Sequence, residues 1–183
     1  YKFIHEIKRE SKRCKKIVQD LLSYARTPQP VLEETDINEL LEQIVDFAAN
    51  HTDMHHVTVK KSFDRTLPPI MVDGDQLRQV AINLILNAGA AMQKGGELVV
   101  STELGGEEWV SLKFSDNGAG ISPEHMEKIF EPFFTTKVKG TGLGLAITRQ
   151  IVEQHHGKIG IESEIGAGTT VEVRLPLQRD EYC

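Results

Sequence analysis

The sequence predicts an α+β fold in which helices cover one face of a mixed β-sheet, preceded by one long amphipathic helix. Helical and strand-like segments are interspersed without the regular strand-helix-strand repeat of a doubly wound fold, which favours a two-layer α/β sandwich. The 183 residues are 39% hydrophobic and 26% charged, which is typical of a globular chain that buries a core.

The first 27 residues predict a helix that packs on other helices. Apolar or small side chains recur there at alternating steps of three and four, the seam of a coiled coil or helical bundle. They are Ile4, Ile7, Ser11, Cys14, Val18, Leu21 and Ala25. One amphipathic helix lying on its own domain shows a similar stripe, so that alternative stays open. Pro28 and Pro30 end the helix. We therefore expect a partial dimerisation-type helix at 1–27, a linker at 28–35 and a second domain at 36–178.

The elements of the second domain follow from caps, periodicity and breakers. Asp36 and Glu39 form a capping box ahead of an apolar stripe that reaches residue 48, which predicts a helix. Alternating side chains predict strands at 57–63 and 70–72, and a helix with an apolar face runs from about 75 to 92.

The second half of this domain continues the mixed pattern. Ser122 and Pro123 predict the cap and first turn of a short helix, and a longer helix at 144–156 is closed by Gly157. His155 and His156 place partial positive charge in its last turn, which suits the helix dipole. Further strands are expected at 97–102, 109–115, 158–163 and 169–175. We also expect Phe130, Phe133 and Phe134 to be core anchors.

Charge is distributed unevenly along the chain. The net charge is −6, yet residues 1–26 carry eight basic and three acidic side chains. These bases alternate with apolar residues at helical spacing, so we expect no nucleic-acid partner.

No apolar run approaches the roughly 20 residues of a membrane-spanning helix, and two cysteines do not make a disulfide framework. These features favour a cytoplasmic location, and they are compatible with a membrane anchor elsewhere in the parent protein.

Candidate ligand groups lie at four places in the second domain, the last of which is GAGTTV at 166–171. Asn83 and Asn87 stand four apart on the helix at 75–92, so their carboxamide oxygens share a face and suit a hard cation such as Mg²⁺. Asp116 ends a strand ahead of Gly118 and Gly120, where a carboxylate accepts hydrogen bonds and the backbone approaches a ligand closely.

A third group of residues precedes the helix at 144–156. Alternate glycines there leave backbone N–H groups and the helix N-terminus open to phosphates. They are Gly140, Gly142 and Gly144. The spacing matches neither GxxxxGK[ST] nor GxGxxG.

In this order, these segments resemble the ATP-binding boxes of sensor histidine kinases of two-component systems. QVAINLILNAGAAM resembles the N box, DNGAGI the first glycine box, FEPFFTTK the F box, GTGLGLAI the second glycine box and GAGTTV a further glycine segment. The preceding DLLSYAR resembles the end of the second helix of the dimerisation hairpin. The F box and short lid are most similar to the nitrogen-regulation and PAS-sensor subgroup.

The resemblance implies a Bergerat-type site for ATP and Mg²⁺. In it, Asn87 is a metal ligand assisted by Asn83, Asp116 accepts from the adenine amino group, and Thr169 lies near the adenine edge. Lys137 and Lys139 flank the lid near the triphosphate. The nucleotide-binding set implied in this way is Asn83, Asn87, Asp116, Gly118, Gly120, Lys137, Gly140, Thr141, Gly142, Leu143, Gly144 and Thr169.

The resemblance further implies a homodimer, a response-regulator partner and transfer of the ATP γ-phosphoryl group to a histidine. HEIKRE at His5 is superficially similar to the acceptor box, but no turn follows it before Arg26, so we expect the acceptor outside this chain. Two alternatives stay open. A gyrase-like or chaperone ATPase of the same fold is expected to carry a general-base Glu near the first asparagine of the motif. That position is Asn83 here, which argues for transfer over hydrolysis. A non-catalytic nucleotide-binding dimerisation module is expected to lose metal or adenine groups.

Overall fold

The computed structural model describes residues 28–106, 108–137 and 140–177, together with single positions between 3 and 22. Those early positions have helical backbone, and Ile4, Ile7, Val18 and Leu21 on the predicted seam are exposed. The single long helix and the three domain boundaries remain predictions. His5 and Lys139 lie outside the described residues.

The centre of the fold is a five-stranded mixed sheet with the strand order β2-β4-β5-β7-β6. Its strands are β2 (Val57–Phe63), β4 (Gly96–Leu104), β5 (Trp109–Asp116), β6 (Lys158–Glu164) and β7 (Gly168–Pro176). β2 runs parallel to β4, and the other neighbours are antiparallel. The expected mixed sheet is therefore confirmed.

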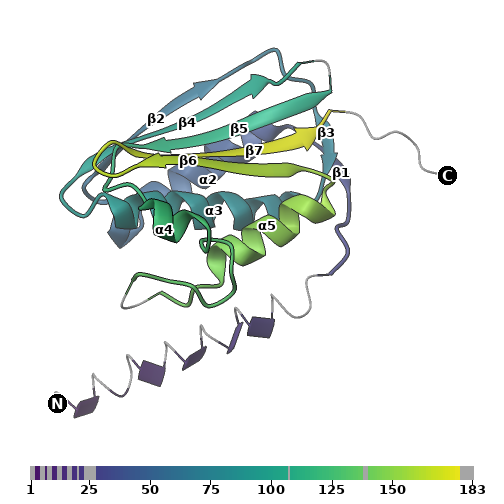
Figure 1. Cartoon of the computed structure of the whole chain (residues 1–183). Coiled ribbons are helices and arrows are strands. Elements are labelled where there is room, and N and C mark those ends of the chain that lie inside the picture. The colour runs from purple at the N-terminus through teal and green to yellow at the C-terminus, as the bar shows by residue number, and fades with distance from the viewer. Residues whose placement is uncertain are drawn as a thin grey trace.

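Three helices cover one face of this sheet, as Figure 1 shows below the strands. They are α2 (Ile37–Ala49), α3 (Gly74–Ala91) and α5 (Gly144–Gln154), and α3 packs against both of the others. Their apolar faces meet the inward side chains of the sheet, among which Leu98, Phe114 and Leu175 are fully buried. The α+β two-layer prediction is confirmed.

The ends of the first two covering helices follow from aspartate caps. Asp36 Oδ1 accepts from Glu39 N at 3.0 Å, while Glu39 Oε1 accepts from Gln43, so the Asp36 half of the expected capping box forms. Asp73 Oδ1 accepts from Gln76 N at 3.0 Å, which starts α3 slightly before the predicted position.

Several short elements lie outside the five-stranded sheet and its three covering helices. β1 (Glu33–Thr35) lies in the segment predicted as a linker and pairs antiparallel with β3 (Ile70–Val72). A 3₁₀ turn, η1 (Thr52–Met54), precedes β2, and the expected short helix is α4 (Pro123–Met126). Ser122 stands at its N-cap, but its side chain makes no capping bond and its Oγ is buried without a partner among the described residues.

The expectation that three phenylalanines are core anchors is wrong. Phe133 is 58% exposed and has a φ of 69°, while Phe130 and Phe134 are half-buried, so the three do not act together as core anchors. Gly157 closes α5 as expected, and the left-handed residue of this ending is His156, with a φ of 56°. His156 N donates to Glu153 O and Gly157 N to Val152 O, as in a Schellman ending.

His155 also differs from its expected role. It is buried, its Nε2 accepts from Asp73 N at 3.0 Å, and its Nδ1 lies 2.8 Å from the Ile151 carbonyl. One ring nitrogen accepts and the other donates, which is the hydrogen-bonding pattern of a neutral imidazole. His155 therefore joins α5 to the start of α3 and does not place charge at the helix end.

Candidate functional site

Helix α3 presents two asparagines at the edge of its buried face. Apolar side chains of α3 from Leu77 to Ala88 face the core, so Asn83 and Asn87 are half-buried on the flank beside them. Asn83 Nδ2 donates to the Gly144 carbonyl at 3.3 Å, and Asn87 Oδ1 accepts from Lys137 Nζ at 2.8 Å. The two amides therefore connect α3 to the start of α5 and to the segment that precedes it.

The end of β5 supplies the carboxylate. Asp116 Oδ1 accepts from Gly118 N at 2.8 Å, and the side chain is about half-buried. Burial raises the pKa of Asp116 above its ordinary value, whereas the N–H groups of Gly118 and Thr169 and the charge of Lys137 act in the opposite direction. The backbone thus holds a partly desolvated acceptor in a fixed direction.

Two glycines let the loop after Asp116 pass close to its neighbours. A Cβ on Gly118 would lie 2.9 Å from Ala91, one turn beyond Asn87 on α3. Gly120 has a φ of 72°, and a Cβ there would lie 2.0 Å from the Glu164 carbonyl oxygen. This loop is therefore fitted between the end of α3 and the turn that joins β6 to β7.

The segment before α5 folds back on itself. Phe133 N donates to the Gly142 carbonyl at 2.9 Å, and Gly142 has a φ of 71°. Gly140 N donates to Lys137 O at 3.0 Å, and Leu143 is fully buried at the N-cap of α5 without a side-chain cap. The first N–H groups of α5, beginning at Gly144 beside Asn83, therefore receive no capping side chain.

These contacts bring most of the predicted residues into one site. Asn83, Asn87, Lys137 and Gly144 are joined by hydrogen bonds, and Lys137 interacts electrostatically with Asp116. Thr169 is buried and pairs directly with Asp116 across β7 and β5. Gly118 and Gly120 frame the loop, while Gly140, Thr141 and Leu143 lie on the segment leading into α5.

One residue of this site was not expected from the sequence. Ser163 on β6 bonds with the Thr169 hydroxyl at 2.8 Å and accepts from Ile121 N at 2.9 Å. Its only signal in the sequence is an inward position in an alternating strand, which is also the signal of an ordinary core side chain.

The donor set fits a hard cation held together with a ligand that supplies oxygens. In the described part of the chain, no group of three or more His, Cys, Asp and Glu residues is arranged to hold a metal. The Asn87 amide oxygen, however, accepts a hydrogen bond from the Lys137 ammonium. It is therefore directed into the site and interacts with a cation there. One or two protein oxygens completed by phosphates and water are a usual environment for Mg²⁺.

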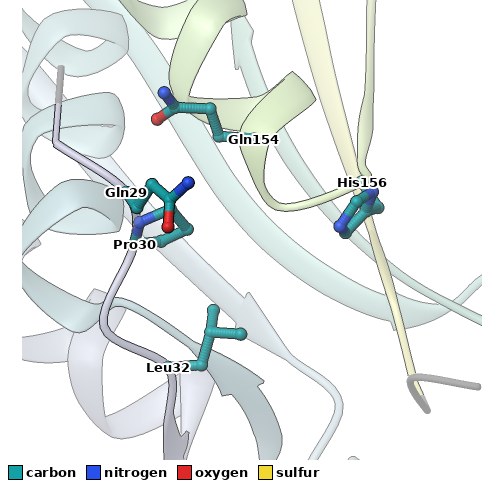
Figure 2. Close-up of a pocket in the computed structure, with 5 residues that line it drawn as sticks. All are labelled: Gln29, Pro30, Leu32, Gln154 and His156. Carbon is teal, nitrogen blue, oxygen red and sulfur yellow. The ribbon is translucent and has the colours of Figure 1, made fainter. Parts of the chain in front are cut away.

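A separate cavity of about 380 Å³ lies at the other end of α5, between the segment before β1 and the end of the helix. Figure 2 shows Gln29, Pro30 and Leu32 across from Gln154 and His156. None of these residues belongs to the site built around Asn87 and Asp116. No helix among the described residues is long and apolar enough to cross a membrane.

Comparisons with known proteins agree with this geometry. Residues 72–179 match the family described as histidine kinase-, DNA gyrase B- and HSP90-like ATPase. The chain is 31% identical to sporulation kinase E of Bacillus subtilis over 178 residues, covering 97% of the chain and 24% of that protein. It is 35% identical to sensor histidine kinase ZraS of Escherichia coli over 169 residues, covering 92% of the chain and 36% of that protein.

A solved structure extends the comparison to the whole chain. The crystal structure of histidine kinase ThkA in complex with response regulator protein TrrA matches with a TM-score of 0.80 and 28% identity, covering 97% of this chain and 51% of that one. The chain spans about a quarter to a third of the length of the two curated relatives named above. From the family match and the arrangement of the site, the chain belongs to the histidine kinase-, DNA gyrase B- and HSP90-like ATPase family and carries a catalytic domain of the sensor histidine kinase type.

Proposed function

We propose that this chain is the catalytic region of a protein-histidine kinase, which transfers the γ-phosphoryl group of ATP to a histidine on a dimerisation helix. The observation that carries the proposal is the convergence of Asn87 and Lys137 with Asp116 at one end of α3. Amide oxygen, ammonium and carboxylate at one place suit a metal, phosphates and an amino-bearing base respectively.

Phosphoryl transfer asks the protein mainly for positioning and charge stabilisation. Lys137 and the uncapped N–H groups at the start of α5 would bind the triphosphate, and Asp116 would accept from the adenine amino group. Asn87, assisted by Asn83, would hold Mg²⁺, which neutralises charge on the phosphates when bound. The acceptor imidazole nitrogen forms the new bond to the γ-phosphorus, and ADP leaves with the electrons of the broken P–O bond.

The partners follow from the same proposal. A second copy would pair through the seam of the first 27 residues, whose described apolar members are exposed. A response regulator would receive the phosphoryl group on an aspartate, and the complex of ThkA with TrrA supports this type of partner. We place this region in the cytoplasm, and its membership of the nitrogen-regulation and PAS-sensor subgroup stays a prediction.

Calorimetric titration with a non-hydrolysable ATP analogue, with and without Mg²⁺, tests the binding site. We expect affinity to rise with Mg²⁺ in the wild type, this increment to disappear in Asn87→Ala, and binding to be lost in Asp116→Asn. Removal of a hydrogen bond to a charged group costs about tenfold or more in affinity.

Two exposed positions provide matched controls. Asp46→Asn on α2 and Asn50→Ala at its C-cap change the same residue types. Asp46 pairs with Lys61 on β2 and Asn50 Nδ2 donates to the Asp46 carbonyl, so both variants are expected to bind like the wild type. If a folded wild-type chain does not bind the analogue, the proposal is wrong and the non-catalytic dimerisation module is favoured. Steady release of inorganic phosphate with no acceptor labelled would favour the ATPase alternative.

A further inference from the structure

One row of side chains crosses four strands at the end of the sheet that carries Asp116. Asp116 on β5 pairs with Leu98 on β4 and Thr169 on β7, and Thr169 pairs with Ser163 on β6. Directly opposite residues of antiparallel strands project to the same face. Because Leu98 is fully buried beneath the helices, the whole row lies on the helix-covered face.

The Ser163 hydroxyl makes three hydrogen bonds to its surroundings. Its Oγ donates to the Gly168 carbonyl at 2.9 Å, accepts from Ile121 N at 2.9 Å and lies 2.8 Å from Thr169 Oγ1. These three bonds join β6 to the start of β7 and to the loop that follows Asp116. Ser163 therefore has a structural role, because it holds this loop against β6 and β7.

The single hydroxyl hydrogen of Ser163 gives this residue a second role. A serine hydroxyl has one hydrogen, and a carbonyl accepts only, so the hydrogen of Ser163 is used on Gly168. In the bond between the two hydroxyls, Thr169 must then be the donor. The Thr169 hydroxyl therefore offers only lone pairs to any further partner.

Thr169 and Asp116 are consequently two acceptors side by side. Thr169 also stands directly opposite Asp116 in the pairing of β7 with β5, which fixes the two residues side by side. Two acceptors that face the 6-position of a purine favour an amino group there, because its two hydrogens serve both acceptors. They oppose a ring with a carbonyl at that position, because facing lone pairs repel and the buried acceptors stay unsatisfied.

We propose that Ser163 is a positioning residue that fixes the hydrogen-bond direction of Thr169 and thereby makes the site select a 6-aminopurine over a 6-oxopurine. The proposal deepens the proposed function and rests on it, since it requires that a nucleotide base occupies the space before Asp116. Ser163 does not touch the nucleotide, and it acts through the Thr169 hydroxyl.

The test compares triphosphate analogues of adenosine and guanosine by calorimetry in Mg²⁺. In Ser163→Ala, Thr169 Oγ1 is released to rotate and donate, so we expect the preference for adenine over guanine to fall about tenfold. Ser163→Thr keeps the hydroxyl and is expected to keep the preference. The increase in affinity with Mg²⁺ should persist in both variants, because Asn87 is unchanged.

Several outcomes separate this proposal from the proposed function. If the wild type binds the adenosine analogue with Mg²⁺ and Ser163→Ala weakens both analogues equally, Ser163 is structural only and the inference is overturned while the proposed function stands. Failure of the wild type to bind overturns both.

A second variant keeps the test decisive if Ser163→Ala does not fold. Thr169→Val removes the hydroxyl that Ser163 directs and is expected to lose the same preference. A Thr169→Val variant that discriminates like the wild type would overturn the inference. When both substitutions are combined in a folded chain, we expect no further loss beyond that of Thr169→Val alone.

Discussion

At the scale of single residues, the environment of Asp116 has opposing effects on its carboxylate. Its carboxylate accepts from the Gly118 N–H and faces a space where a donor is expected, yet burial raises its pKa. Groups with pKa values shifted by burial are common at functional sites, because a desolvated acceptor binds a donor more strongly than an exposed one. The unliganded protein bears the cost of keeping this charge away from water.

Asp116→Asn is therefore expected to leave the unliganded protein as stable as the wild type or more stable at neutral pH. An acid whose pKa is raised on folding contributes stability that is present below its unfolded pKa and lost as pH rises through the folded pKa. The advantage of the variant should thus grow from acidic toward neutral pH. Urea unfolding of both proteins across this range measures the difference, and an advantage that shrinks as pH rises would contradict the raised pKa of Asp116.

At the scale of elements, the boundaries of the helices and strands were largely predictable because caps and apolar periods repeat in the sequence. The asparagines of α3 and the glycines around α5 were also found, since ligand-binding loops require small or polar residues at fixed spacing. The hydrogen bond from Lys137 to Asn87 was not predicted, because contact between residues 50 positions apart depends on the tertiary fold.

Other features of the elements left no local signal. The exposed Phe133 has a left-handed backbone because its N–H bonds to Gly142, and hydrophobicity alone predicts burial. The αL position after α5 is taken by His156, while Gly157 is required where a Cβ would lie 2.5 Å from the Arg174 carbonyl oxygen on β7. β1 has three residues, too few for a period to be recognised.

The turn before α5 is expected to tolerate no side chain at Gly142. In Gly142→Ala, the left-handed φ and a Cβ 2.3 Å from the Phe133 carbonyl carbon would destabilise the fold by about 1–3 kcal/mol and weaken nucleotide binding. Gly160→Ala is the matched control, since a Cβ there meets nothing within 4 Å, and it should be neutral or slightly stabilising. Equal unfolding free energies for the two variants would contradict this explanation.

At the scale of the whole molecule, one network ties the segment before β1 to both helices of the site. Val31 N donates to Asp73 Oδ2 at 3.0 Å, Asp73 N donates to His155 Nε2, and Gln76 Nε2 donates to Pro28 O at 3.2 Å. The start of α3 and the end of α5 are thereby held together beside the cavity of Figure 2. The opposite halves of the same helices carry Asn87 and Gly144.

This network is expected to respond strongly to loss of His155. His155→Phe keeps a ring in the buried position but leaves the Asp73 N–H without its acceptor, which costs about 1–3 kcal/mol of unfolding free energy. His55→Phe at an exposed position should stay within about 0.5 kcal/mol of the wild type. Chemical unfolding of both variants checks this, and a His155 variant as stable as its control would show that the network contributes little.

Transfer of labelled phosphate from ATP to a histidine tests the kinase activity itself. ATP labelled on the γ-phosphate is incubated with Mg²⁺ and this catalytic region, with a histidine-bearing dimerisation hairpin supplied on the same or on a separate chain. We expect label on the hairpin that is lost in acid and stable in alkali, as phosphohistidine is, and no label with Asn87→Ala or Asp116→Asn. An unlabelled hairpin, with release of inorganic phosphate or with no turnover of bound ATP, would contradict the proposed kinase activity.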